Sequence, residues 1–205
     1  MGNFSIMFVT SNNAKIALAN ERLNRYGITI TQKIASTPEI QSLDVGEVAL
    51  QKAKQVAHTI KTPFIIEDSG LYIDKLNGFP GALMKPVLDT IGTHNLLSML
   101  SNEENRSAYV KSVLVYHDPV IGNEQLFVGN YPGRIAEKEK GDNTRGWKVA
   151  RIFIPKDFDK TPAEMDDSEW TEFLDKFRKG DHYDKFGEWL IKQNMKQFGI
   201  DAGDA

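Results

Sequence analysis

Cysteine is absent from the 205-residue sequence. This absence excludes a disulfide framework and a thiolate zinc site, so any bound metal ion must have oxygen or imidazole ligands. The sequence also lacks an apolar run long enough to cross a bilayer, and its N-terminus has no basic region ahead of an apolar stretch. We therefore expect a cytoplasmic protein with no membrane partner.

Positive charge is not in excess either. The chain has 25 Lys and Arg residues against 28 Asp and Glu residues, and its formal net charge is −3. A protein that follows a nucleic-acid backbone needs a basic face to displace counterions, so we expect no nucleic-acid partner. Local lysines can still bind a small polyphosphate.

The length and a hydrophobic content of 40% predict one domain over residues 1–205. Its first half predicts strand, helix, strand and helix in that order, and its middle predicts a hairpin of two long strands. The first helix begins after Asn12 or Asn13 and ends at Gly27. The expected strands span residues 5–10, 28–35, 64–67, 71–73, 108–117, 125–137 and 149–154, and further helices span residues 45–60, 168–179 and 183–198, with shorter helical segments around residues 96–100.

The segment from Glu67 to Gly81 carries the strongest functional signal. Glu67 and Asp68 follow an apolar run, and we expect a Ser-Gly turn at residues 69–70 directly after them. In open α/β sheets, ligands bind in the crevice beyond the carboxyl ends of the strands. Two adjacent carboxylates are costly unless a cation, a lysine or a shared proton compensates their charge. The pair therefore suits a hard divalent ion, with Mg²⁺ as the default. For the pair taken alone, a solvated strand end is the alternative.

Residues 10–15, TSNNAK, lie where the first expected strand meets the first helix. Backbone N–H groups and the helix dipole favour an anion at such a place. The segment adds the hydroxyls of Thr10 and Ser11, the amide of Asn12 and the cation of Lys15. It lacks the paired glycines and the Gly-Lys-Ser/Thr ending of a P-loop. A capping asparagine with a solvated lysine therefore explains it at least as well.

Together with Lys52 on the second expected helix, these segments resemble the inosine triphosphate pyrophosphatase family. Members of that family hydrolyse non-canonical purine nucleoside triphosphates to the monophosphate and pyrophosphate. Four motifs occur here in the family's order, within about the first 85 residues. Lys85 falls where eukaryotic members carry a lysine. The matching positions are Thr10, Asn12 and Lys15; Pro38, Glu39, Gln41 and Lys52; Glu67, Asp68, Ser69, Gly70 and Leu71; and Gly78, Pro80 and Gly81.

The resemblance implies a mixed, strongly curved β-sheet flanked by helices, with two lobes around a long cleft. It also implies a nucleoside triphosphate substrate, a Mg²⁺ cofactor and a homodimer. Cleavage of a phosphoanhydride needs mainly an aligned water molecule and neutralised charge, which suits these residue types. The implied catalytic residues are Asp68, which orients the attacking water, and Lys15 and Lys52; the implied metal ligands are Glu39, Asp68 and Glu67; the implied substrate-binding residues are Thr10, Ser11, Asn12, Ser69, Gly70, Lys85, Trp147, Lys148 and His182.

The match weakens in the second half of the chain. Residues 145–149 read RGWKV where the family has Phe-Gly-Trp/Tyr-Asp-Pro, and His182 alone remains of a Ser-His-Arg signature. We expect Trp147 to offer a stacking face, with Arg145, Lys148 and His182 as readers of the base. Because a rewritten polar pattern changes which base is bound, we expect a shifted base specificity. The alternatives are a core position for Trp147, a surface position for His182, and solvated Arg145 and Lys148.

Two other functions are compatible with the sequence. One is a pyrophosphatase for another modified nucleotide, which a substrate panel would distinguish. The other is a nucleotide-binding module without turnover. The set Lys15, Glu39, Lys52 and Asp68 argues against the second, because a sensor needs no base beside its metal ion.

Overall fold

A seven-stranded mixed β-sheet forms the centre of the computed structural model, which describes residues 4–197. Its strands are β1 (Phe4–Val9), β2 (Ile28–Lys33), β3 (Phe64–Ile73), β4 (Pro80–Gly81), β5 (Ser107–Asp118), β6 (Asn123–Ile135) and β7 (Phe153–Pro155). The strand order is β2-β1-β3-β5-β6-β7, and β4 pairs with β3 beside this path. β1 pairs in parallel with β2 and β3, whereas the other pairs are antiparallel.

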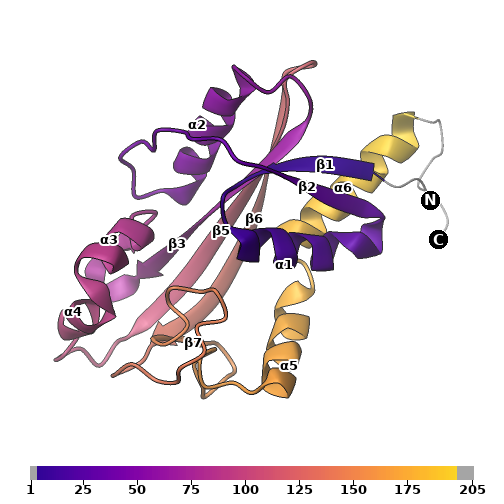
Figure 1. Cartoon of the computed structure of the whole chain (residues 1–205). Coiled ribbons are helices and arrows are strands. Elements are labelled where there is room, and N and C mark those ends of the chain that lie inside the picture. The colour runs from indigo at the N-terminus through magenta and orange to yellow at the C-terminus, as the bar shows by residue number, and fades with distance from the viewer. Residues whose placement is uncertain (1–3, 198–205) are drawn as a thin grey trace.

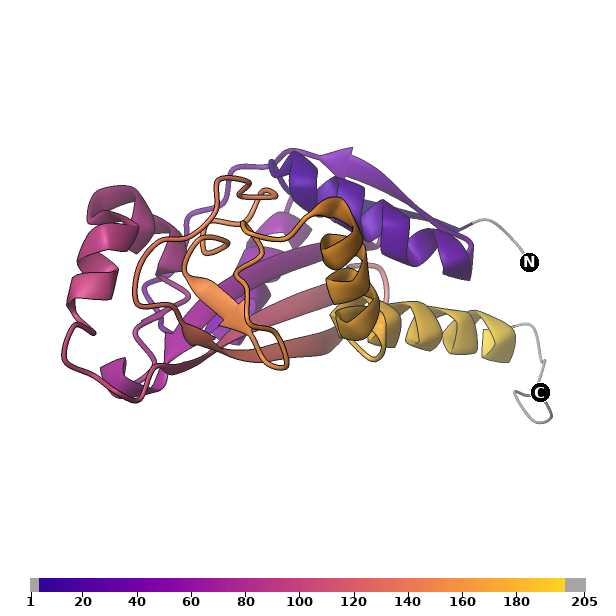
Figure 2. The ribbon, with the colours of Figure 1, turned by 90° about the horizontal axis from the view of Figure 1, so that it is seen from below.

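Helices cover both faces of this sheet (Figure 1). α2 (Val45–Ala57) packs on β3 and β5, and α6 (His182–Gln197) packs on β5, β6 and α1 (Asn13–Leu23) on the opposite face. The view from below shows α1, α6 and α5 (Asp167–Arg178) on the same side of the sheet (Figure 2). The predicted fold class, a mixed sheet flanked by helices, is thereby confirmed. The remaining helices are α3 (Met84–Thr90), α4 (Gly92–Ser98) and two 3₁₀ turns at Asn24–Tyr26 and Asp74–Leu76.

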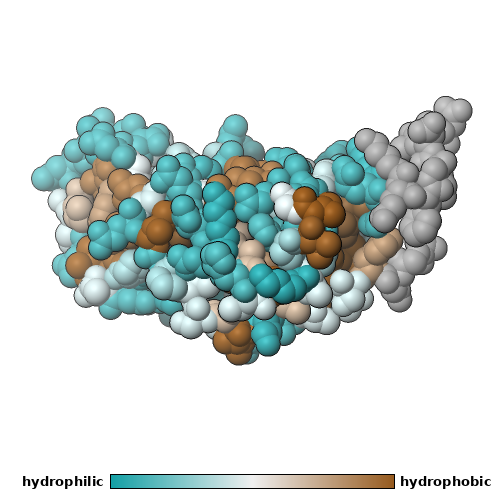
Figure 3. Space-filling model, turned by 90° about the horizontal axis from the view of Figure 1, so that it is seen from above, coloured by the Kyte–Doolittle hydropathy of each residue, from teal (hydrophilic) through white to brown (hydrophobic). Residues whose placement is uncertain are grey.

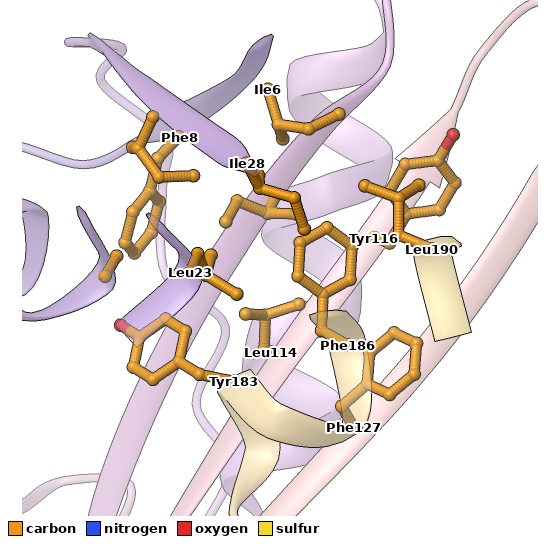
Figure 4. Packing of buried hydrophobic residues seen from close by; sticks show 13 residues of the cluster. Ile6, Phe8, Leu23, Ile28, Leu114, Tyr116, Phe127, Tyr183, Phe186 and Leu190 are labelled. Carbon is orange, nitrogen blue, oxygen red and sulfur yellow. The ribbon is translucent and has the colours of Figure 1, made fainter. Parts of the chain in front are cut away.

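Each face of the sheet buries its own apolar cluster. Beneath α6, Phe186 lies among Ile28, Leu114 and Phe127 (Figure 4). A second cluster lies beneath α2. Successive side chains of a strand point to opposite faces, so Ile65 and Ile66 of β3 join different clusters. This alternation decides where the functional residues that follow them on β3 can point.

The sheet is incomplete on one edge of β3. β1 pairs with β3 only at Phe64 and Ile65, and β4 pairs with it only at Leu71 and Tyr72. Along residues 66–70, β3 has β5 as its single strand neighbour within the part of the chain that the structure describes. Between the end of β1 and the start of β4, the backbone of β3 is therefore open to side chains from other elements.

Three expectations about local structure need correction. The Ser-Gly turn expected at residues 69–70 is wrong: β3 continues from Phe64 to Ile73, because β5 pairs with it along its whole length. The strand expected over residues 149–154 is confined to β7. The helix expected from residue 183 begins one residue earlier, and its expected end at residue 198 lies outside the described residues.

Among residues 4–197, none of the helices is both long enough and apolar enough to span a bilayer. Seen from above, the surface is mainly hydrophilic, with apolar residues in small separate patches (Figure 3). The predicted single domain and the predicted long cleft between two lobes stay predictions.

Candidate functional site

The turn between β1 and α1 holds three of the predicted substrate-binding residues. Asn12 is the N-cap of α1, and its Oδ1 accepts hydrogen bonds from the backbone N–H groups of Ala14 (2.9 Å) and Lys15 (3.3 Å). The hydroxyl oxygen of Thr10 accepts a bond from the N–H of Asn12 at 3.1 Å. Ser11 is exposed beside them. The turn thus brings Thr10, Ser11 and Asn12 together at the positive end of the helix dipole.

Lys15 reaches from the first turn of α1 to the open edge of β3. Its Nζ donates a hydrogen bond to the backbone oxygen of Glu67 at 2.9 Å and lies 3.8 Å from Oε1 of the same residue. The side chain of Lys15 is 23% exposed. Because β1 no longer pairs with β3 at this level, the backbone oxygen of Glu67 is available to a side chain. An ammonium group therefore stands beside the turn that begins α1.

Lys52 of α2 lies between two carboxylates on the other face of the sheet. Its Nζ is 2.5 Å from Oδ2 of Asp68 and 2.6 Å from Oε1 of Glu39. Burial alone would lower the pKa of Lys52, but the charges of Asp68 and Glu39 and their hydrogen bonds outweigh burial and raise it. Lys52 is therefore a cation at neutral pH. The structure brings together Glu39, Lys52 and Asp68, as the sequence predicts.

The loop that carries Glu39 is anchored to the sheet near its end, at Leu43. The hydroxyl of Tyr72 donates a hydrogen bond to the oxygen of Leu43 (2.9 Å) and accepts one from the N–H of Val45 (3.0 Å). The oxygen of Leu43 also accepts a bond from the N–H of Ala82 at 3.0 Å. Through these contacts the loop before α2 is fixed to both β3 and the segment after β4.

Glu67 and Asp68 lie on opposite faces of the sheet, although they are adjacent in sequence. The carboxylate of Asp68 contacts Lys52 of α2, and that of Glu67 contacts Tyr183 of α6. No group of three or more acidic or histidine side chains suited to a metal ion occurs among the described residues. The prediction that Glu67 shares one metal ion with Glu39 and Asp68 is therefore wrong in its geometry. Glu39 and Asp68 alone converge.

The carboxylate of Glu67 is buried in a polar environment. The Tyr183 hydroxyl donates a hydrogen bond to its Oε2 at 2.6 Å, and the Ser69 hydroxyl donates one to its Oε1 at 3.1 Å. Nε2 of His182 lies 3.6 Å from Oε1. Burial tends to raise the pKa of Glu67, but the charge of Lys15, the nearby imidazole of His182 and the hydrogen bond from Tyr183 outweigh burial and hold it well below its usual value. Glu67 is thus an ionised, buried carboxylate.

Comparison with known proteins identifies the family. The Ham1 family model matches residues 6–178. This chain belongs to the Ham1 family. The family and the enzyme class predicted from the sequence, a hydrolase that acts on a phosphoanhydride, are thereby confirmed.

Curated relatives in the Ham1 family match over nearly their whole length. The chain is 38% identical to a dITP/XTP pyrophosphatase of Thermococcus kodakarensis over 93% of this chain and 99% of the relative. It is also 38% identical to a protein of the same name from Methanopyrus kandleri, over 93% of this chain and 97% of the relative. A solved Ham1 protein of Coxiella burnetii has a TM-score of 0.75 and 24% identity, covering 92% of this chain and 99% of its own. That likeness supports the fold.

Three of the predicted substrate-binding residues of this Ham1 protein, Trp147, Lys148 and Lys85, lie in later segments of the chain. Trp147 is partly buried and packs edge-on against Trp170 and Phe173, at 6.0 and 5.8 Å between ring centroids, and its role as a stacking face stays a prediction. Lys148 forms an ion pair with Asp89 of α3. Lys85, also on α3, is exposed. These three predicted residues lie outside the cluster around β3.

Arg145 is held against the protein rather than solvated. Its Nη2 donates to the backbone oxygen of Met165 at 2.6 Å, its Nη1 lies 3.2 Å from Oδ1 of Asp167, and its side chain is only 10% exposed. The guanidinium also lies over the ring of Trp170, 5.1 Å from its centroid. The solvated position considered for Arg145 is therefore wrong, and its role in reading a base stays a prediction.

His182 is buried, contrary to the surface position considered for it. Its side chain is 3% exposed, its Nδ1 lies 3.0 Å from the Tyr131 hydroxyl, and its Nε2 has no hydrogen-bond partner within the described part of the chain. Asp181 next to it caps α6 and forms an ion pair with Arg22. Only the absence of a β-carbon at Gly129 lets His182 come so close to β6.

Sequence reasoning missed Tyr183, Tyr131 and Arg22 as members of this polar cluster. Tyr183 stands in the place of the arginine of the Ser-His-Arg signature. A lone arginine on the apolar face of an amphipathic helix signals a buried partner, and Arg22 at the end of α1 is such a residue. No local pattern marks Tyr131, since aromatic residues are ordinary in strands.

Proposed function

We propose that this protein hydrolyses non-canonical nucleoside triphosphates to the nucleoside monophosphate and pyrophosphate. One observation carries the proposal: two lysines and two carboxylates from four separate segments meet around adjacent residues of β3, beside the N-terminus of α1. The four side chains are Lys15, Glu39, Lys52 and Asp68. The names of the curated relatives support the substrate class.

Lys15 and the turn before it suit the phosphate chain. The ammonium of Lys15 stands one turn inside α1, and the N-terminus of that helix favours an anion. Lys52 brings a second cation from the other face of the sheet. Each lysine within ~4 Å of a phosphate oxygen contributes roughly 4 kcal/mol of Coulomb attraction at the effective dielectric of a protein surface, before desolvation.

Glu39 and Asp68 suit a hard divalent ion such as Mg²⁺. An oxygen of each carboxylate already lies 2.5–2.6 Å from one cationic atom, Nζ of Lys52, so the pair can coordinate a shared cation. Mg²⁺ in proteins is usually held by one or two carboxylates together with substrate phosphates and water. The side chain of Glu39 is 58% exposed, which leaves room for phosphate oxygens and water molecules around the ion. When bound, the ion would neutralise charge on the phosphates.

Asp68 is the residue that we assign to the attacking water. In the reaction, the water oxygen forms a bond to the α-phosphorus, the bond from that phosphorus to the bridging oxygen breaks, and pyrophosphate leaves. The carboxylate of Asp68 accepts the proton that the water loses. Lys15 and Lys52 stabilise the negative charge that develops on the leaving pyrophosphate.

A shifted base specificity is a second element of the proposal. Its support is the replacement of the family's aromatic and acidic residues by Arg145 and Lys148, and the partners these side chains have: Met165 and Asp167 for Arg145, and Asp89 for Lys148. Comparison of kcat/KM for inosine, xanthosine and the common nucleoside triphosphates tests this element. A clear preference for inosine or xanthosine would contradict the shift and leave the chemistry intact.

Substitution of Asp68 tests the catalytic assignment. Asp68→Asn keeps the size of the side chain and removes its ability to accept a proton. We expect pyrophosphate release to fall by about 10²–10⁴-fold while nucleotide binding is retained. Asp74→Asn, at an exposed carboxylate in the 3₁₀ turn after β3, is the matched control. Undiminished hydrolysis by Asp68→Asn would remove Asp68 from this role, and binding without any turnover by the unsubstituted protein would favour a nucleotide-binding module.

Three finer properties follow from the family resemblance. We propose Mg²⁺ as the physiological ion, a homodimer as the assembly and the cytoplasm as the location. The first is tested by activity after chelation and re-addition of single divalent ions. Sedimentation at several protein concentrations tests the second.

A further inference from the structure

Of the three carboxylates Glu39, Glu67 and Asp68, only Glu67 does not contact Lys52. Its side chain is 6% exposed and points to the α6 face, away from Asp68 and Glu39. An isolated carboxylate at such a depth is costly, so its partners must compensate for lost hydration. Those partners are the hydroxyls of Tyr183 and Ser69 and the ammonium of Lys15.

Tyr183 is placed rigidly enough to orient this carboxylate. Its ring is fully buried in the cluster beneath α6, near Leu23 (Figure 4). Its hydroxyl reaches Oε2 of Glu67 at 2.6 Å, a short bond typical of a hydroxyl that donates to a charged oxygen. Glu67 is thereby held by a residue of α6.

Lys15 keeps donor capacity for an anion in this arrangement. An ammonium group has three N–H donors, and the contacts of Lys15 with described residues are one hydrogen bond at 2.9 Å and one longer ion pair at 3.8 Å. Both involve Glu67. The carboxylate is therefore close enough to hold Lys15 electrostatically but does not accept a hydrogen bond from it. The remaining N–H groups can bind a phosphate.

We propose that Tyr183 and Glu67 are positioning residues for Lys15: the buried hydroxyl fixes the carboxylate, and the carboxylate with its own backbone oxygen holds the ammonium at the open edge of β3, ready for a phosphate of the substrate. This inference rests on the proposed function. It also gives a role to the residue that departs from the Ser-His-Arg signature: Tyr183 stands in place of the arginine and contacts Glu67, which lies beside Lys15. In this role neither residue needs to touch the substrate.

A double-mutant cycle tests the proposal without any metal ion. The dissociation constant of inorganic tripolyphosphate is measured by calorimetry, in the absence of divalent ions, for the unsubstituted protein, Tyr183→Phe, Lys15→Met and the double variant. Tyr183→Phe removes one hydroxyl and preserves the packing of the ring. We expect it to weaken binding about three- to tenfold when Lys15 is present and to have no effect when Lys15 is methionine. In turnover, Tyr183→Phe should raise KM and also lower kcat, because Lys15 both binds the phosphates and stabilises charge on the leaving pyrophosphate, and neither change should occur when Lys15 is methionine.

Tyr116→Phe is the matched control. Tyr116 is buried in the same cluster, and the carboxylate that raises the pKa of its hydroxyl, after burial itself, is Asp118 rather than Glu67, so tripolyphosphate affinity should not change. If Tyr183→Phe does not fold, Ser69→Ala removes the other hydroxyl bonded to Glu67 and completes the same cycle with the same criterion.

The cycle separates failure of this inference from failure of the proposed function. An equal loss of affinity in both Lys15 backgrounds, or no loss in either, overturns the positioning role and leaves the phosphate site in place. Unchanged binding in Lys15→Met overturns the phosphate site itself, and the positioning role with it.

Discussion

At Gly70 of β3, the backbone of β4 comes very close to the backbone of β3. A β-carbon added at Gly70 would lie 2.7 Å from the carbonyl oxygen of Gly81 and 2.8 Å from its carbonyl carbon. Both are backbone atoms, so they cannot move aside as the end of a flexible side chain can. Residue 70 must therefore be glycine for β4 to pair with β3 beside Asp68.

Gly70→Ala should lower the free energy of unfolding by about 1–3 kcal/mol, as other overpacked sites do. It should also lower kcat, because Asp68 lies two residues away. Urea unfolding and pyrophosphate release measure the two effects. The control is Gly122→Ala, where φ is +65° and no atom lies within 4 Å of an added β-carbon, so only backbone strain of about 1–2 kcal/mol is expected, with normal kcat. Unchanged kcat in Gly70→Ala would contradict this view of the edge.

Among the larger elements, the loop of residues 34–44 carries Glu39 and has no regular structure of its own. Its end is fixed by Tyr72, whose hydroxyl satisfies both the oxygen of Leu43 and the N–H of Val45 at the start of α2. One side chain from β3 therefore sets the position of the loop and of the helix that carries Lys52.

Tyr72→Phe should cost about 1–3 kcal/mol of stability, because the buried N–H of Val45 loses its partner. It should also raise the concentration of divalent ion needed for half-maximal activity, since the loop bearing Glu39 is less restrained. Tyr109→Phe is the matched control: its ring stacks on Tyr72 at 4.9 Å, and its hydroxyl makes no hydrogen bond within residues 4–197. Chemical denaturation and a metal titration compare the two variants, and equal effects would refute the anchoring role.

For the whole molecule, ion pairs couple stability to pH. The folded-state pKa of Glu67 is lowered, since its charged and hydrogen-bonding partners outweigh burial, and the pKa of Asp44 is lowered by its backbone hydrogen bonds and Lys111, again against burial. Carboxylates with lowered pKa stabilise the fold above their unfolded-state pKa of about 4–4.5, and this contribution is lost as the pH falls through the folded value. Burial raises the pKa of Asp181, which has the opposite effect.

The free energy of unfolding should therefore fall steadily as the pH is lowered from about 5 to 3. Glu67→Gln removes the most buried of the contributing carboxylates, so its stability should be lower than that of the unsubstituted protein at pH 7 and should depend less on pH in this range. Urea midpoints at several pH values measure both curves. Glu104→Gln, at an exposed residue without hydrogen bonds or ion pairs in the described chain, should follow the unsubstituted protein. Parallel curves for Glu67→Gln would exclude Glu67 as a source of the pH dependence.

Much of the proposed phosphate-binding and metal-binding part of the site could be predicted from the sequence. Asn12 caps α1, Lys15 and Lys52 approach β3, and Glu39 meets Asp68 through Lys52, as their motifs indicate. The cap follows from a short spacing along the chain, whereas the meeting of Lys15, Lys52, Glu39 and Asp68 is what the family resemblance implies, since residues as far apart as Lys15 and Glu67 contact each other. The expected base-binding part of the site could not be predicted in the same way, because Trp147 and His182 pack against segments that are far away in sequence.

The sequence by itself determined the order of helices and strands and the helix start beside β1, because these depend on neighbours within a few positions. Only the tertiary structure decided that residues 64–73 form one strand, since pairing with β5 outweighs the preference of a Ser-Gly pair for a turn. Once the strand is continuous, alternation sends Glu67 and Asp68 to opposite faces. Two carboxylates that look like one site in the sequence thereby acquire different partners, Lys15 and Lys52.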